Sequence, residues 1–510
     1  MGFPFCGQIR SLQFPHLLFL GLTRHAVVCC LLQPVLDGSI NLLHPSSNES
    51  SHVQGYCETE ATLASSLDFW TVSSDNLIAV LPVDPVKENY VRKVKNCIFS
   101  IAFPTPFKSR VRLVAVSKEV LEDILDLDSS VSKTDDFIQL VSGKKIAFGS
   151  IPLAHRYGGY QFGIWADQLG DGRAHLIGIY TNRQGEKWEL QLKGSGKTPY
   201  SRNGDGRAVL RSSVREFLCS EAMHYLGIPT SRAASLVVSD DEVWRDQFYN
   251  GNITKERGVC NTDNFSLLSI TIDYGPFGFM ENYNPDFVPN TSDDERRYKI
   301  GNQASIGMFN LNKLLQALNP LLDARQKQLA AQILEGYPVL YYTRFQKLFK
   351  AKLGLLGERE GDDDLIAFLL HLMEKTEADF TMTFRQLSEI TQSQLLELNI
   401  PQQFWALKTV SKHKLFPAWV SQYLLRLESN MNDSDSERRK RMTTVNPRYV
   451  LKNWMAESAV QKAEKNDFSE VHLLQQVLRH PFQKHPAAEK AGYASPTPSW
   501  AKDLRVSCSS

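Results

Sequence analysis

The chain has 510 residues, of which 42% are hydrophobic and 22% are charged, and its formal net charge is only +1. This composition is typical of a globular protein of about two to four domains, and it excludes wholesale disorder and a collagen-like chain. It does not favour a nucleic-acid binder, because one short basic run, 438–441, follows three acidic residues and is interpreted as part of a solvated linker. The eight cysteines include no C-x-x-C pair, so neither a structural zinc site nor a disulfide framework is predicted.

Residues 1–36 contain no Asp or Glu and carry Arg10 and Arg24 among apolar residues. An acid-free, basic leader predicts a targeting segment, with mitochondrial import favoured and a secretory signal as the alternative. The apolar runs are shorter than the roughly 20 residues that a membrane-spanning helix needs, so no transmembrane segment is predicted. Residues 37–76 are interpreted as a linker, and the folded body is predicted to start near Leu77.

The first folded region, 77–257, mixes strand patterns with turn residues. Strands are predicted over 99–103 and 111–116, and a short helix over 118–127. A hairpin follows, with strands over 175–181 and 188–193 joined by the turn 182–187. An amphipathic helix over 213–226 and a strand over 234–238 complete the region. Alternation along the second hairpin strand places Lys193, its last residue, on the polar face.

Glu216, near the start of the predicted helix, has two possible roles. With Ser213 it forms the S-x-x-E pattern of a capping box. It could equally pair with Lys193, as the helix glutamate and the strand lysine do in protein kinases. The local sequence favours neither role.

Three glycine-rich turns lie within fewer than fifty residues, at 170–173, 193–198 and 203–207. The second contains Gly196-Lys197-Thr198, which invites comparison with the phosphate-binding P-loop. That motif needs a glycine at position 191, where this chain has Gln191, so a P-loop is excluded.

A second polar cluster, 261–264, precedes the apolar run 267–272 and then Asp273. Asn264 and Asp273 carry the hard oxygen ligands that magnesium prefers, at the two ends of a predicted strand. The cluster therefore predicts a two-ligand magnesium site, and the alternative is a polar turn that closes a hairpin.

The rest of the chain is predicted to be mostly helical. Apolar spacing predicts helices in the region 258–427, over 311–318, 324–333, 341–352, 365–373 and 395–398. Residues 428–442 are interpreted as a charged linker, and 443–510 as a further helical extension with a cysteine-containing tail.

Several sequence blocks together resemble one family, the selenoprotein O family. They are the runs 158–163, 170–173, 191–210, 215–217, 261–264 and 273–279, with Trp500-Ala501 and the Cys-Ser-Ser ending. The resemblance extends over nearly all of the chain from Leu77 to Ser510. It implies an α+β, protein-kinase-like bilobal fold, with a β-rich nucleotide-binding lobe (77–257) and a mostly α-helical lobe (258–427). It also implies transfer of AMP from ATP to Ser, Thr or Tyr hydroxyls exposed on protein substrates.

The resemblance assigns roles position by position. The residues implied to contact ATP are Gly170, Gly172, Arg173, Lys193, Asp205, Gly206 and Asp273. Asn264 and Asp273 would bind Mg²⁺ (or Mn²⁺), and Asp263 would be the catalytic proton acceptor. Lys193 would pair with Glu216. Cys508 stands where many members carry selenocysteine, and it is predicted to take part in redox control.

The chain departs from the family between Arg257 and Gly258, where members have several tens of further residues. That segment carries two phosphate-binding arginines and the connection between the lobes. Three functions are therefore weighed: a protein adenylyltransferase, a conventional protein kinase, and a nucleotide-binding product whose catalysis is impaired.

Overall fold

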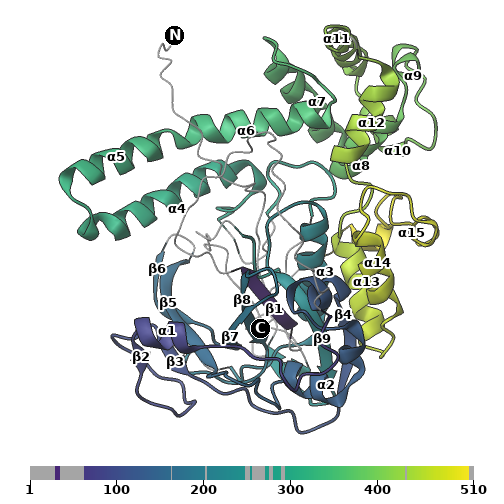
Figure 1. The fold of residues 1–510 in the computed structure, drawn as a ribbon. Coiled ribbons are helices and arrows are strands. Elements are labelled where there is room, and N and C mark those ends of the chain that lie inside the picture. The colour runs from purple at the N-terminus through teal and green to yellow at the C-terminus, as the bar shows by residue number, and fades with distance from the viewer. Residues whose placement is uncertain are drawn as a thin grey trace, which may run out of the picture.

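The computed structural model describes residues 29–34, 62–161, 164–201, 204–246, 253–255, 270–274, 279–288, 293, 295–430, 433–502 and 504. These residues form a mixed α+β structure, with a sheet-containing N-terminal part and a helical C-terminal part (Figure 1). Within this part of the chain, no helix is long and apolar enough to cross a membrane.

The N-terminal part is built on one sheet, which has nine strands among the described residues. Its path is β2-β3-β5-β7-β8-β1-β9-β4, with β6 paired to β5, and every neighbouring pair except β2–β3 is antiparallel. The strands are β1 (Cys29–Pro34), β2 (Val83–Asp84), β3 (Phe99–Ile101), β4 (Val111–Val116), β5 (Leu153–Gln161), β6 (Ile164–Gly170), β7 (Ala174–Thr181), β8 (Lys187–Lys193) and β9 (Arg232–Ser239). A separate pair consists of β10 (Trp244–Asp246) and β11 (Ile253–Lys255).

The predicted hairpin is confirmed as β7 and β8. Its turn is closed by Asn182, whose Oδ1 accepts hydrogen bonds from the backbone N–H groups of Gln184 at 3.1 Å and Glu186 at 2.8 Å. Leu190 and Leu192 are buried on one face of β8, as alternation predicts. The predicted strands 99–103, 111–116 and 234–238 are confirmed as β3, β4 and β9, with small shifts in their ends.

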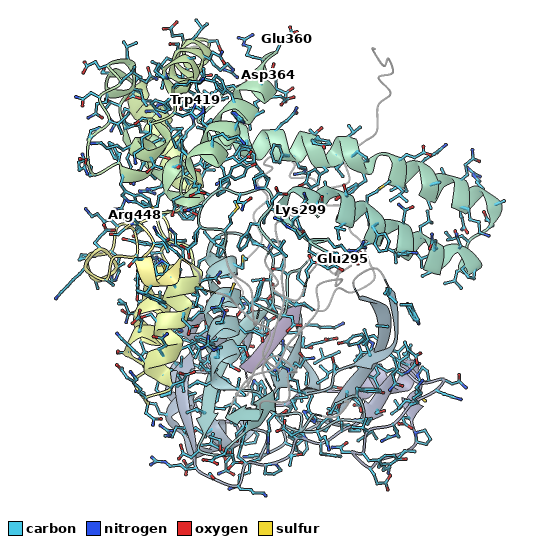
Figure 2. All side chains as sticks on the ribbon, turned by 180° about the vertical axis from the view of Figure 1, so that it is seen from behind. Glu295, Lys299, Glu360, Asp364, Trp419 and Arg448 are labelled. Carbon is cyan, nitrogen blue, oxygen red and sulfur yellow. The ribbon has the colours of Figure 1, made fainter. Side chains whose placement is uncertain are left out.

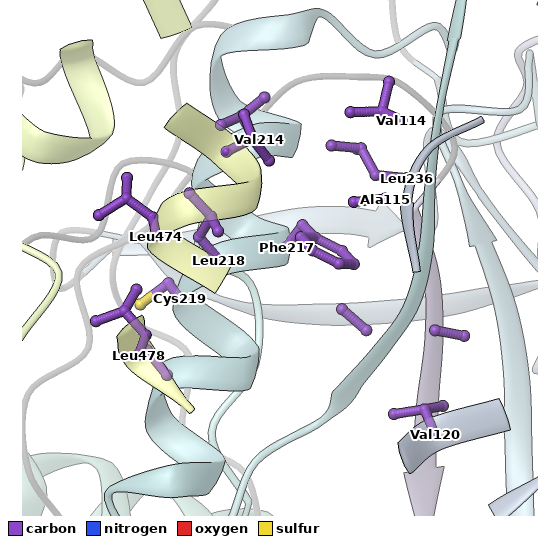
Figure 3. Packing of buried hydrophobic residues seen from close by; sticks show 14 of the residues in the cluster. Val114, Ala115, Val120, Val214, Phe217, Leu218, Cys219, Leu236, Leu474 and Leu478 are labelled. Carbon is purple, nitrogen blue, oxygen red and sulfur yellow. The ribbon is translucent and has the colours of Figure 1, made fainter. Parts of the chain in front are cut away.

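Helix α3 (Leu210–Tyr225) lies against the sheet and begins three residues before the predicted start. Its N-cap is Val209, which makes no side-chain cap, and both Ser213 and Glu216 are buried inside the helix. The capping-box interpretation is therefore wrong. Phe217 points toward Leu236 and Ala115 of the sheet (Figure 3).

Shorter helices complete the N-terminal part: α1 (Asp75–Val80), the π-helix η1 (Val120–Ile124), the 3-10 helix η2 (Ser129–Lys133) and α2 (Asp135–Val141). The helix predicted over 118–127 is thus shorter than expected. The folded body also starts before Leu77, because Trp70 is buried and its Nε1–H donates to the Leu125 carbonyl at 3.0 Å.

The C-terminal helices form three groups (Figure 1). An arm of long helices comprises α4 (Gln303–Leu318), α5 (Ala324–Glu335) and α6 (Tyr337–Lys352), and none of its residues is buried. The second group has its own core and comprises α7 (Asp362–Thr376), α8 (Phe380–Glu389), α9 (Gln392–Leu396), α10 (Trp405–Val410), α11 (Phe416–Glu428) and α12 (Asp435–Val445). The third comprises α13 (Asn453–Ala463), α14 (Ser469–Leu478) and α15 (Pro486–Lys490), and it shares the core of the sheet and α3.

Aromatic packing holds the second group together, and ion pairs of Arg448 join it to the third group. In the second group, Trp419 is fully buried and stacks on Tyr423 with ring centroids 5.0 Å apart (Figure 2). Arg448 links the second and third groups, because its guanidinium pairs with Glu389 of α8 at 3.3 Å and with Glu489 of α15 at 2.7 Å (Figure 2).

The interpretation of 428–442 as a charged linker is wrong, because most of this segment is helix α12. Ser434 caps the helix by accepting from the Glu437 N–H at 3.2 Å. Arg438 is fully buried and donates to the carbonyls of Leu387 at 3.0 Å and Ile390 at 2.7 Å. Its charge is satisfied by backbone carbonyls and Asp435, so composition alone could not reveal it as a core residue.

Strand β1 lies between β8 and β9, and its Cys29 pairs in register with Lys193. This strand belongs to the segment 1–36 that was predicted to be a targeting segment. A strand inside a sheet makes backbone hydrogen bonds to a neighbour on each side, so β1 is part of the fold. The predicted end of the targeting segment at residue 36 is therefore wrong.

Deleting residues 1–35 is expected to lower the midpoint of thermal unfolding, because the backbone groups of β8 and β9 that face β1 would lose their partners. The expected size is about 2 to 4 °C for each kcal/mol lost. Deleting residues 1–28 is the matched control and is expected to leave the midpoint unchanged. Equal midpoints for the two deletions would contradict the place of β1 in the sheet.

Candidate functional site

Lys193 lies at the centre of a charged cluster where the sheet, α3 and the segment 270–274 meet. Its Nζ donates to Glu216 Oε1 at 2.6 Å and also to Asp273 Oδ1. Only 12% of the Lys193 side chain is exposed. The structure therefore contains the ion pair with Glu216 that was one of the two predicted roles of this glutamate, and it adds a second carboxylate.

Regular structure places the first two members of the cluster. Lys193 ends β8 on the face opposite the buried Leu190 and Leu192. Glu216 lies in the second turn of α3 and is 3% exposed. A strand end and a packed helix both fix their side chains within a narrow range of positions, as a phosphate-contacting site requires.

Asp273 is placed by contacts of the residues around it. Thr271 forms a bridge with Thr230, and its backbone N–H donates to the Pro229 carbonyl at 2.9 Å. Tyr274 is fully buried, with its hydroxyl 2.6 Å from Thr230 Oγ1. Asp273 itself has φ +70°, in the left-handed region that non-glycine residues seldom adopt. Strain of this kind persists where surrounding contacts hold it, and it is common at functional sites.

The cluster keeps Lys193 charged. Burial lowers the pKa of Lys193, but the carboxylates of Asp273 and Glu216 outweigh this effect and leave the pKa raised. Burial raises the pKa of Glu216, against the attraction of the lysine. The site thus has a permanent cation flanked by two acids, which suits it to bind a phosphate group together with a metal cation.

The three glycine-rich turns pack on one another next to this cluster. Gly194 N–H donates to the Arg173 carbonyl at 2.6 Å, and Gly196 N–H to the Gly206 carbonyl at 3.1 Å. A Cβ at Gly172 would lie 2.8 Å from the Tyr200 carbonyl oxygen, and one at Gly206, where φ is +69°, 2.0 Å from the Gly196 oxygen. These glycines are therefore required for close approach of the turns, in addition to any contact with a nucleotide.

The predicted site residues are not all equally close to Lys193. Gly170 ends β6, Gly172 and Arg173 lie in the turn that leads to β7, and the buried Arg173 exerts an electrostatic effect on Lys193. Asp205 is exposed in a neighbouring turn, where its Oδ1 accepts from the Arg207 N–H at 2.8 Å. The predicted catalytic Asp263, the metal ligand Asn264 and the tail Cys508 lie outside the described residues.

The glycine-rich turn 170–173 contains Asp171, to which neither the sequence patterns nor the family resemblance assigns a role. Its Oδ2 accepts from the His155 N–H at 3.0 Å. Burial, together with the nearby carboxylates of Glu189 and Asp273, raises the pKa of Asp171 to about 7. Its position between two glycines, in a turn that leads into the hairpin of Lys193, is the signal that could have identified it.

A metal ion fits the chemistry of this cluster. Asp273 and Asp171 offer carboxylate oxygens, which are the hard ligands that Mg²⁺ prefers. Among the described residues, no group of three or more His, Cys, Asp or Glu side chains is arranged to hold a metal.

Comparison with known proteins decides the family. Residues 88–251 and 253–479 match the family model described as protein adenylyltransferase SelO. The chain belongs to this family. Among its relatives is a protein of Azoarcus sp., 36% identical over 520 residues that include 86% of this chain and 98% of the relative. A relative from Pseudomonas fluorescens is 36% identical, and the match covers 83% of this chain and 98% of the relative. A relative from Burkholderia lata is 38% identical, and the match covers 78% of this chain and 91% of the relative. All three are named protein nucleotidyltransferase YdiU.

The same comparisons agree with an internal segment that is missing from this SelO-family chain. The Azoarcus match has 520 aligned positions, whereas 86% of 510 residues is about 439, so about 80 positions have no residue here. The family match is also broken at residue 252, close to the predicted junction of Arg257 and Gly258.

Replacing Asp171 by Asn is expected to change how stability depends on pH. The pKa of this carboxyl is raised from 3.8 to about 7 on folding, so between these values the folded chain holds a proton that the unfolded chain has released. Its contribution to stability therefore falls as pH rises through this window. The midpoint of thermal unfolding of Asp171→Asn, minus that of the parent chain, should therefore be several degrees higher at pH 8 than at pH 5. A difference that is constant with pH would contradict the buried, raised-pKa carboxyl.

Proposed function

We propose that this chain transfers AMP from ATP to Ser, Thr or Tyr hydroxyls of proteins, with Mg²⁺ (or Mn²⁺), at the cluster around Lys193. The observation that carries the proposal is the Lys193–Glu216 ion pair, 2.6 Å long and flanked by Asp273, in a chain of the SelO family. The relatives named protein nucleotidyltransferase support the same reaction class.

A protein-kinase-like architecture is part of the proposal. A strand lysine paired with a helix glutamate is the device by which kinases hold a lysine toward ATP phosphates. Here β8 supplies the lysine and α3 the glutamate, and a mostly helical part follows in the chain. The alternative of a conventional kinase uses the same pocket and differs only in which phosphorus is attacked.

The chemistry assigns a task to each residue. Asp273 and Asn264 would hold the magnesium ion, which supplies charge neutralisation at the phosphates. Lys193 contributes a fixed positive charge to the same phosphates. A hydroxyl oxygen of the protein substrate forms a bond to the α-phosphorus, the bond from that phosphorus to the bridging oxygen breaks, and pyrophosphate leaves. Asp263 accepts the hydroxyl proton.

One observation favours a second candidate function, a nucleotide-binding product with impaired catalysis. About 80 aligned positions of the relatives have no residue in this chain, and the family resemblance places two phosphate-binding arginines among them. Lys193, Glu216 and Asp273 lie outside that segment, so the chain can bind a nucleotide even if catalysis is lost.

Two further features rest on the sequence alone. We propose mitochondrial targeting by the acid-free, basic residues that precede Cys29. We also propose that Cys508 forms a reversible disulfide, which would place the activity under redox control.

ATP labelled on the α-phosphate is expected to label a protein substrate, and ATP labelled on the γ-phosphate is expected not to. Lys193→Ala should abolish this transfer, because it removes the phosphate-contacting charge. Lys187→Ala, at the other end of the same strand, is the matched control and should retain it. Label from the γ-phosphate would identify a kinase. No label from either, with ATP binding intact, would identify the impaired product.

Restoring the family's missing segment between Arg257 and Gly258 is expected to raise transfer by at least about tenfold, because charged phosphate contacts are typically worth over 1 kcal/mol each. The measurement compares kcat/KM for ATP in the two chains. An insert of the same length made of Gly and Ser is the control. Equal activity of the original and restored chains would show that the segment is dispensable.

A further inference from the structure

Helix α3 has a second charged face, which is directed away from Lys193 toward the C-terminal helices. Arg211 and Arg215 lie four residues apart and so share one face of the helix, while Glu216 is turned by about 100° from Arg215. Both α13 and α14 pack on α3. In the apolar part of this contact, Leu218 and Cys219 lie beside Leu474 and Leu478 (Figure 3).

The charged part of the contact is buried and specific. Arg211 is in a two-pronged ion pair with Glu457 of α13, and its Nη2 donates to Oε1 at 2.8 Å. Arg215 Nη2 donates to Asn453 Oδ1 at 2.6 Å. The side chains of Arg211 and Glu457 are 14% and 7% exposed, so solvent screens the pair little. A pair of this geometry fixes the position of the two helices relative to each other.

The start of α13 is itself anchored to two other parts of the fold. Lys452, the N-cap of α13, forms a backbone bridge with Phe279, six residues after Asp273. Its ammonium pairs with Asp379, the N-cap of α8, and both side chains are 3% exposed. Within residues 452–457 the chain thus contacts α3, α8 and Phe279.

We infer that the first turns of α13 are a positioning element for Lys193. Asn453 and Glu457 hold α3 so that Glu216 reaches Lys193, and Lys452 anchors the start of α13 to Phe279 and α8. Asn453 and Glu457 act through Arg211, Arg215 and Glu216 and do not touch the nucleotide. The inference deepens the proposed function, since it names the residues that keep its central ion pair assembled.

The test measures the reactivity of Lys193, which does not require transfer activity. Sulfosuccinimidyl acetate acetylates the neutral amine of lysine, and peptide mapping by mass spectrometry follows the rate at Lys193 in the full chain. Loss of the Glu216 carboxylate releases the Lys193 amine from its ion pair and opens access to it, so Glu216→Gln sets the upper limit of the rate. Glu457→Gln and Asn453→Ala are expected to raise the rate by about threefold or more, because α3 then holds Glu216 against Lys193 for a smaller fraction of the time.

The control and a double variant separate positioning from a general loss of stability. Glu489→Gln breaks a comparable ion pair with Arg448 in the same C-terminal extension and is expected to leave the rate at Lys193 unchanged. Adding Glu457→Gln to Glu216→Gln should give no further increase in the acetylation rate at Lys193, because Glu457 acts on Lys193 through Glu216. If Glu457→Gln does not fold, Asn453→Ala takes its place in both the comparison with Glu489→Gln and the double variant with Glu216→Gln.

An unchanged rate in the α13 variants would overturn the inference, as would an equal rise in Glu489→Gln or an additive double variant. Failure of the proposed function looks different, since a chain that transfers no AMP would still show the change in Lys193 reactivity. Conversely, the inference alone would be refuted if the chain transfers AMP and the α13 variants do not change the acetylation rate at Lys193.

Discussion

The structure depends on one interaction, the ammonium of Lys193 held between the carboxylates of Glu216 and Asp273. The three residues come from β8, α3 and the segment after β11, so the cluster forms only when these elements are correctly packed. A buried cation between two acids is strongly destabilised if one partner is removed, because the remaining charges lose their compensation. The fold therefore has to supply rigid supports on every side, and it does so through β1 beside β8, Tyr274 beside Asp273 and α13 beside α3.

The sequence predicted the parts of this site that depend on local periodicity. Alternation in 188–193 was enough to place Lys193 at a strand end on the polar face, and β8 confirms it. The role of Glu216 could not be decided locally, because an S-x-x-E pattern has the same appearance at a helix start and inside a buried helix. The packing of α3 decided it, since Ser213 and Glu216 are both enclosed and the helix begins at Leu210.

The failures of prediction share a physical cause, which is long-range pairing. Arg438 lies in a run of charges and is nevertheless fully buried, because carbonyls of Leu387 and Ile390, about fifty residues away, accept its hydrogen bonds. The strand Cys29–Pro34 pairs with β8 and β9, which lie over 150 residues further along the chain. Neither composition nor periodicity carries information about such partners.

The helical arm α4–α6 exposes an unusual number of apolar side chains. Helices α4, α5 and α6 bury no side chain, and Leu321, Ile333, Val339 and Tyr342 are among their region's exposed apolar residues. A contiguous helical arm of this kind gains little from the hydrophobic effect, which stabilises a helix through burial of one face. Stability is therefore expected to be lowest in this arm, whereas the cluster around Lys193 lies in a part of the fold that buries its apolar residues.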